Sequence, residues 1–169
     1  MAISWKYYPL NKRIPKPLLD TISIFEKNYD EIKSTSEKLE SNEVLKNISG
    51  DLEQVGFIVE KGKKRDDKIR VPVLYGRQGK VDLAFEADAL WRDEKIVLEV
   101  EAGRGVTNYQ FLKDLFQACM MDDVEYFAVA VRQIYRTSQD YEKVINFFDA
   151  LYASNKLILP LKGVLVIGY

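Results

Sequence analysis

Two stretches of the chain, Gly79-Lys-Val-Asp-Leu-Ala-Phe-Glu86 and Lys95-Ile-Val-Leu-Glu-Val-Glu-Ala-Gly103, decide the fold that we expect. In both, apolar and polar side chains alternate, and a period of two residues is typical of a β-strand with one buried face. The apolar residues of each stretch occupy one face, so the acidic residues share the other face. Each strand is therefore predicted to carry two carboxylates on a single face.

These acidic residues are Asp82 and Glu86 in the first strand, and Glu99 and Glu101 in the second. If the two strands form a hairpin across residues 87–94, Asp82 lies roughly opposite Glu99, at about 5 Å between Cβ atoms. Like charges at that separation are destabilising unless water surrounds them or a cation binds among them. The pattern leaves two interpretations open: solvated residues on the polar face of a sheet, or a metal site.

The absence of histidine restricts the chemistry of such a site. The chain has 169 residues, with no histidine and a single cysteine. This composition excludes a Ser-His-Asp triad, a Cys-His dyad, a His-ligated zinc and an intrachain disulfide. Carboxylates remain, and they suit hard cations such as Mg²⁺ or Mn²⁺, which polarise phosphodiesters and need no imidazole ligand.

The rest of the composition is typical of one globular domain, with 47% hydrophobic and 30% charged residues and a net charge of −1. No secretory signal and no apolar run long enough to cross a bilayer is visible, so we expect a cytoplasmic protein. Helical spacing is predicted over 16–32, 43–56, 108–121 and 139–154, and strands over 57–60, 69–75, 80–86, 95–102, 126–131 and 162–169. The domain is therefore expected to be mixed α/β, with an N-terminal arm and helix (1–35), a core (36–135) and a C-terminal helix and strand (136–169).

The two acidic strands resemble the core of the PD-(D/E)xK, or restriction-endonuclease-like, superfamily. That pattern places an acid in one strand and an acid-x-lysine at the end of the next. The superfamily's core order, α-β-β-β-α-β, also fits residues from about 43 to 131. The resemblance implies an α/β (α+β) fold, with a central mixed sheet of four to five strands flanked by helices.

Carried over residue by residue, the resemblance assigns Asp82 and Glu99 to the two metal-binding acids. Glu101 stands where the superfamily has lysine, and this E-x-E ending resembles restriction endonucleases of the BamHI type. Glu101 would then bind metal or act as the base that deprotonates the attacking water. A displaced basic residue could serve instead, and Arg104 and Lys113 are the candidates. Additional site candidates are Glu43, on the helix before the first strand, Glu86 and Gln110.

Basic residues gather directly before the acidic strands. Between Lys61 and Lys80 there are eight lysines and arginines against two aspartates. They could contact DNA phosphates and offset the repulsion between DNA and the carboxylates, or they could belong to a solubilising hairpin turn. The predicted nucleic-acid-binding residues are Lys63, Lys64, Arg65, Lys68, Arg70, Arg77 and Lys80.

Three functions remain open. The first is a Mg²⁺- or Mn²⁺-dependent endonuclease that hydrolyses DNA phosphodiesters, with a homodimer expected where both strands are cut. The second is a catalytically inactive nuclease-fold protein that binds nucleic acid or a protein partner, suggested by the missing lysine. The third leaves the acids facing solvent on an unrelated α/β fold, which we would infer if Asp82 and Glu99 lay on strands that are not neighbours.

Overall fold

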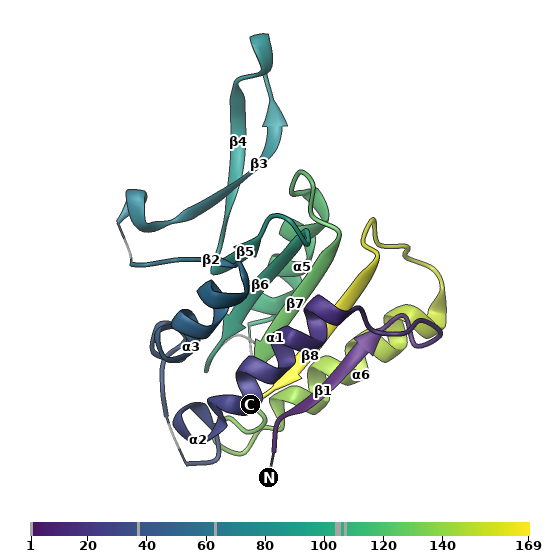
Figure 1. The fold of residues 1–169 in the computed structure, drawn as a ribbon. Coiled ribbons are helices and arrows are strands. Elements are labelled where there is room, and N and C mark those ends of the chain that lie inside the picture. The colour runs from purple at the N-terminus through teal and green to yellow at the C-terminus, as the bar shows by residue number, and fades with distance from the viewer. Residues whose placement is uncertain (1, 37, 63, 104–105, 107) are drawn as a thin grey trace.

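The computed structural model describes residues 2–36, 38–62, 64–103, 106 and 108–169. Helices cover both faces of a central sheet, and a two-stranded arm extends away from this body (Figure 1). No helix in the described ranges is long and apolar enough to cross a membrane.

The central sheet has six strands in the order β1-β8-β7-β6-β5-β2. Their bounds are Ser4–Tyr8 for β1, Gly163–Gly168 for β8, Tyr126–Val131 for β7, Ile96–Glu101 for β6, Ala89–Trp91 for β5 and Ile58–Val59 for β2. β6, β7 and β8 run parallel, while β1, β5 and β2 are antiparallel to their neighbours. Every residue of β8 is buried, as expected for parallel strands covered on both faces.

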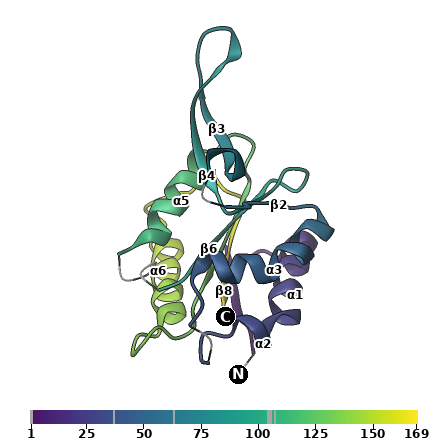
Figure 2. The same ribbon diagram turned by 90° about the vertical axis from the view of Figure 1, so that its left-hand side faces the viewer.

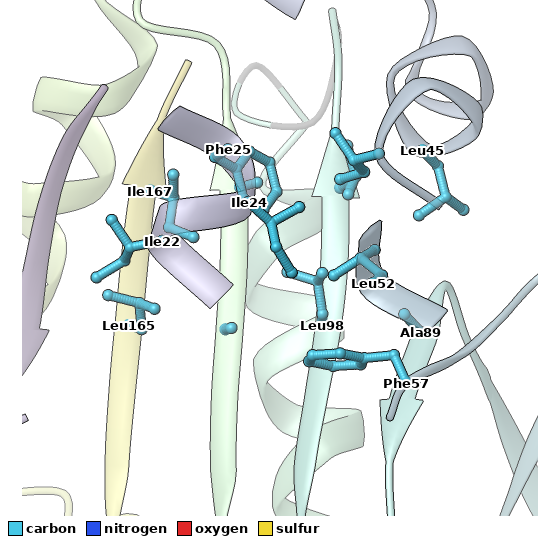
Figure 3. Close-up of a cluster of buried hydrophobic side chains, with 14 of the residues drawn as sticks. Ile22, Ile24, Phe25, Leu45, Leu52, Phe57, Ala89, Leu98, Leu165 and Ile167 are labelled. Atoms are coloured by element: carbon cyan, nitrogen blue, oxygen red, sulfur yellow. The ribbon is translucent and has the colours of Figure 1, made fainter. Parts of the chain in front are cut away.

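Helices lie on both faces of this sheet, one group on each side (Figure 2). The first group is α1 (Lys16–Lys27), α2 (Tyr29–Ile32) and α3 (Ser41–Val55), and the second is α5 (Gln110–Met120) and α6 (Asp140–Ser154). Figure 3 shows the core under the first group, where Phe25 of α1 and Leu52 of α3 lie near Leu98 of β6. The alternating residue Val97 belongs to the core on the α5 and α6 side. Because side chains two residues apart lie on the same face of a strand, Glu99 and Glu101 point to the same side as Val97, toward α5.

The arm consists of β3 (Ile69–Tyr75) and β4 (Val81–Ala87), which pair only with each other among the described residues. Short 3-10 turns at Arg65–Asp67 and Arg77–Gly79 precede the two strands. β4 leads into the central sheet through a single residue, Asp88, before β5 begins. The arm is thus an excursion between β2 and β5 rather than a part of the central sheet.

This topology confirms the expected mixed α/β class and changes two details. The sheet has six strands instead of four to five, because β1 and β2 extend it on its two edges. The expected hairpin between residues 80–86 and 95–102 is wrong. β4 pairs antiparallel with β3, whereas β6 pairs with β5 and β7.

Candidate active site

Six carboxylates of the described residues line one open cleft of about 410 Å³ between the base of the arm, β6 and α5. They are Glu60, Glu86, Asp88, Glu99, Glu101 and Asp114. Lys68, Gln110 and Lys113 also line it. Because these residues come from five separate segments of the chain, only the folded structure brings them together.

Asp88 occupies the junction where the arm joins the central sheet. Its Oδ2 accepts a hydrogen bond of 2.8 Å from the backbone N–H of Val100 on β6, and its carbonyl oxygen accepts one of 2.8 Å from the N–H of Glu60. These bonds fix the carboxyl group beside the acidic end of β6. Burial raises the pKa of Asp88 to about 6, although the Val100 N–H opposes that shift.

Glu99 and Glu101 project from the same face of β6 into the cleft. Burial raises the pKa of Glu99 well above its usual range, and the negative charges of Asp88 and Asp114 raise it further. Burial also raises the pKa of Glu101, and the neighbouring Asp114 carboxyl adds to that effect. The cleft therefore concentrates acidic groups whose charges oppose one another.

Asp114 reaches the cleft from the buried face of α5. It is only 5% exposed and shares that face with Phe111, Leu115 and Ala118. Gln110 Nε2 lies 3.4 Å and Lys113 Nζ 3.2 Å from the Oδ1 atom of Asp114. The Oδ2 atom is buried, and no hydrogen-bond donor within the described part of the chain reaches it.

Glu60 is also buried but has a partner. Lys68 Nζ lies 2.7 Å from its Oε1 atom and 3.9 Å from Oε2 of the exposed Glu86. The Glu60 side chain is 6% exposed, so this ion pair closes one wall of the cleft. The positive charge of Lys68 is directed mainly at Glu60 and not at Glu99 or Glu101.

The donor set of the cleft fits a hard divalent cation. Its ligands are carboxylate oxygens, with neither histidine nor cysteine among them, and Mg²⁺ and Mn²⁺ favour such oxygen ligands. The orphaned Oδ2 of Asp114 and the crowded acids favour a cation there. Among the residues that the structure describes, however, no three acids form a preassembled metal-ligand group. Binding would therefore have to draw the side chains together.

Asp82, the acid expected opposite Glu99, lies outside this cleft. It is exposed on the arm, where its carboxyl group packs over Gly76 and leaves no room there for a Cβ atom. The expected juxtaposition is wrong because β4 pairs with β3, which carries Asp82 away from β6. Asp88, six residues further along the same strand direction, is the acid that reaches the cleft.

The additional candidates divide between the cleft and other places. Gln110 and Lys113 line the cleft, and Glu86 is exposed at its rim. Glu43 does not line it: its Oε2 accepts a 2.7 Å hydrogen bond from the backbone N–H of Glu40 in the capping box of α3. The prediction for Arg104 lies outside the described residues.

The predicted nucleic-acid-binding residues spread along the arm and the loop before it. The exposed ones are Lys64, Arg65, Arg70, Arg77 and Lys80. Lys68 is partly buried in its ion pair with Glu60, and Lys63 lies outside the described residues. The arm's outer half also exposes four apolar side chains: Leu74, Tyr75, Val81 and Leu83.

Sequence reasoning missed Asp88, Asp114 and Glu60. A signal for Asp114 was present, because residues 111, 114, 115 and 118 follow the i, i+3, i+4, i+7 spacing of a buried helical face. An aspartate on such a face requires a partner or a function. Asp88 had no comparable signal, since it was placed in an expected turn.

Comparison with known proteins gives a likeness in fold. No family model matches the chain, and no curated protein matches it. Among solved structures, the chain is similar to "Crystal structure of free BglII", with a TM-score of 0.51 and 15% sequence identity over 99% of this chain and 79% of that chain. BglII is a restriction endonuclease. At this identity the likeness shows the fold alone, and it confirms the restriction-endonuclease-like fold that the resemblance of the two acidic strands implied.

Proposed function

We propose that the chain is a divalent-metal-dependent hydrolase of DNA phosphodiesters. The observation that carries the proposal is the convergence of Asp88, Glu99 and Glu101 in one cleft of a restriction-endonuclease-like fold. The separation of Asp82 from Glu99 removes one predicted ligand but does not leave the acids dispersed, because Asp88 lies where Asp82 was expected. Asp82 and Glu99 do lie on strands that are not neighbours, which was the condition for the third interpretation, an unrelated α/β protein with solvent-facing acids. The likeness in fold and the burial of Glu99 among other acids argue against that interpretation.

In this proposal Asp88 and Glu99 hold the cation, and Glu101 holds it or accepts a proton from the attacking water. The cation would supply Lewis-acid polarisation of the phosphodiester. The N–H of Val100 orients the Asp88 carboxyl group, which leaves its second oxygen for a ligand. Lys113 is our candidate for the positive charge that the superfamily lysine would provide, because its side chain is 54% exposed and lines the cleft.

The arm is the proposed DNA-contacting element. The major groove of B-DNA admits a two-stranded β-ribbon, and β3 and β4 form such a ribbon. Arg70, Arg77 and Lys80 are exposed on or beside it and would contact phosphates. Lys64 and Arg65, in the loop before the arm, would extend the same basic surface. BglII supports DNA as the ligand class through its fold.

Metal-dependent cleavage tests the proposal directly. Single-stranded, double-stranded and branched DNA would be incubated with the full chain in Mg²⁺, Mn²⁺ or EDTA. We expect cleavage in either metal, none in EDTA, and a loss of at least about 100-fold in Glu99→Gln, since charge stabilisation by such sites contributes several kcal/mol. Glu94→Gln is the matched control, because Glu94 is exposed in the turn before β6 and does not line the cleft. Full cleavage by Glu99→Gln would contradict the site assignment.

A catalytically inactive nuclease-fold protein is the second candidate. It is favoured by Glu101 in place of the superfamily lysine and by the lack of a preassembled metal-ligand group among the described residues. Titration calorimetry separates the two candidates. Binding of Mn²⁺ that Asp88→Asn abolishes supports the hydrolase, whereas no heat at millimolar metal, together with retained DNA binding, supports the inactive protein.

Cleavage of both strands of a duplex often uses two active sites, so we propose a homodimer for that case. Sedimentation of the chain with and without duplex DNA measures the stoichiometry. A single copy bound per duplex, together with cutting of only one strand, would favour a monomeric nicking activity.

A further inference from the structure

The buried carboxylates of the cleft differ in how their charge is balanced. Glu60 has the ammonium group of Lys68 at 2.7 Å. Asp88 has the N–H of Val100 at 2.8 Å. Asp114 is only 5% exposed, and both of its polar neighbours, Gln110 and Lys113, approach the same atom, Oδ1. Its other oxygen, Oδ2, has no donor in the described part of the chain.

A buried carboxylate oxygen without a donor costs free energy unless a ligand or a proton satisfies it. The group beside Asp114 is Glu101, a second carboxyl, which can donate a hydrogen bond only while it is protonated. Lys113 cannot serve Oδ2 without leaving Oδ1, and Lys68 is held by Glu60. Lys113 thus balances the charge of Asp114 through Oδ1, while Oδ2 keeps no donor in the described part of the chain.

The position of Asp114 on α5 argues against a purely structural role. Its neighbours on the buried face are apolar, and an apolar residue there would pack without any desolvation cost. A buried helical aspartate with a purely structural role would be expected to bond through both oxygens to protein groups. Here one oxygen is bonded and the other is left at a cleft lined by carboxylates.

We propose that Asp114 of α5 is a cation ligand, which binds a divalent metal ion together with Glu101 of β6. The inference rests on the proposed hydrolase and deepens it, because it adds a ligand from the helix that follows the acidic strand. Asp88 and Glu99 lie on the sheet side of the cleft, so Asp114 would couple the position of α5 to metal occupancy.

Direct metal binding tests this proposal without any activity measurement. The full chain would be titrated with Mn²⁺ while the free ion is followed by electron paramagnetic resonance. We expect Asp114→Asn to weaken Mn²⁺ binding at least tenfold. Glu94→Gln, which changes an exposed acid in the turn before β6 that does not line the cleft, should stay within twofold of the unmodified chain. An affinity of Asp114→Asn within twofold of the unmodified chain would overturn the proposal.

Thermal unfolding distinguishes a ligand from a structural residue. In EDTA, Asp114→Asn should unfold at the same or a higher temperature, because the repulsion between Asp114 and Glu101 is removed and the lost ion pair with the half-exposed Lys113 contributes little stability. In Mn²⁺ the unmodified chain should gain stability and the variant should gain less. A variant that unfolds earlier in EDTA but keeps its full gain in Mn²⁺ would show a structural role. Asp114→Ser provides the same comparison if the Asn variant does not fold.

The outcomes also separate this inference from the proposed function. If Glu99→Gln loses Mn²⁺ binding and Asp114→Asn does not, the hydrolase proposal stands and the role of Asp114 fails. If the unmodified chain binds no Mn²⁺ at millimolar concentration, both fail. Loss in both variants supports both.

Discussion

At the scale of single residues, burial and the repulsion between neighbouring carboxylates act together on the acids of the cleft. Asp88, Glu99 and Glu101 all have raised pKa values, and burial is the largest cause in each case. A folded chain without metal therefore favours the protonated acids more than the unfolded chain does. The stability of the metal-free chain should therefore depend on pH.

The metal-free protein should lose stability as pH rises. The pKa of Asp88 is raised from 3.8 to about 6, so its stabilising contribution is fully present below 3.8 and is lost as pH rises through about 6. Urea denaturation in EDTA at pH 4, 6 and 8 measures this loss, which we expect to be roughly 2 kcal/mol from Asp88. Asp88→Asn cannot ionise, and its amide oxygen can still accept the Val100 N–H, so the variant should show a smaller loss. An unchanged pH profile in Asp88→Asn would contradict the assignment.

At the scale of secondary-structure elements, α5 and the arm differ in how much of their surface packs against the core. α5 packs an apolar face on the sheet and carries Asp114 on that face. The arm buries little of its outer half and ends in the exposed Arg77 and Lys80. Ile69, Val71 and Ala87 at the base of the arm belong to the core, but the outer half does not, so substitutions there should cost little stability.

Substitutions at the arm's turn should therefore weaken DNA binding without unfolding the chain. For the double variant Arg77→Ala/Lys80→Ala we expect duplex DNA affinity to fall uniformly across sequences. The slope of log K against log salt should shrink by about 2, since each phosphate contact contributes about 0.9. Fluorescence anisotropy from 50 to 300 mM salt measures the slope, and thermal unfolding should change by less than about 0.5 kcal/mol.

Glu26→Gln is the charge control for this experiment, because Glu26 is an exposed residue on the outer side of α1, away from the arm. An unchanged salt slope in the double variant would place the DNA surface elsewhere.

At the scale of the whole molecule, one sheet unites segments from both ends of the chain. β1, at the N-terminal end, pairs with β8 at the C-terminal end, and α1 packs on the same sheet face as α3. The N-terminal and C-terminal segments thus contribute to the same sheet and its core, in keeping with the single domain that we expect. We expect a single cooperative unfolding transition.

Truncation of a core residue of α1 tests that cooperativity. Phe25 is fully buried, and its ring centroid lies 6.4 Å from that of Tyr169, the last residue. Phe25→Ala should lower the free energy of unfolding of the whole chain by about 3–5 kcal/mol. Circular dichroism and tryptophan fluorescence should report the same shifted midpoint. Two separate transitions would show that the N-terminal helices fold independently of the sheet.

The sequence by itself determined the local structure and the chemistry of the site. Alternation placed Glu99 and Glu101 on one face of a strand, helical spacing marked α5, and the lack of histidine left oxygen ligands. Only the tertiary structure decided which acids meet. Strand periodicity sets the face of a side chain but not the partner of a strand, and pairing β4 with β3 moved Asp82 out and left Asp88 at the cleft. Asp114 joined them because packing α5 on the sheet is a long-range contact that no local pattern specifies.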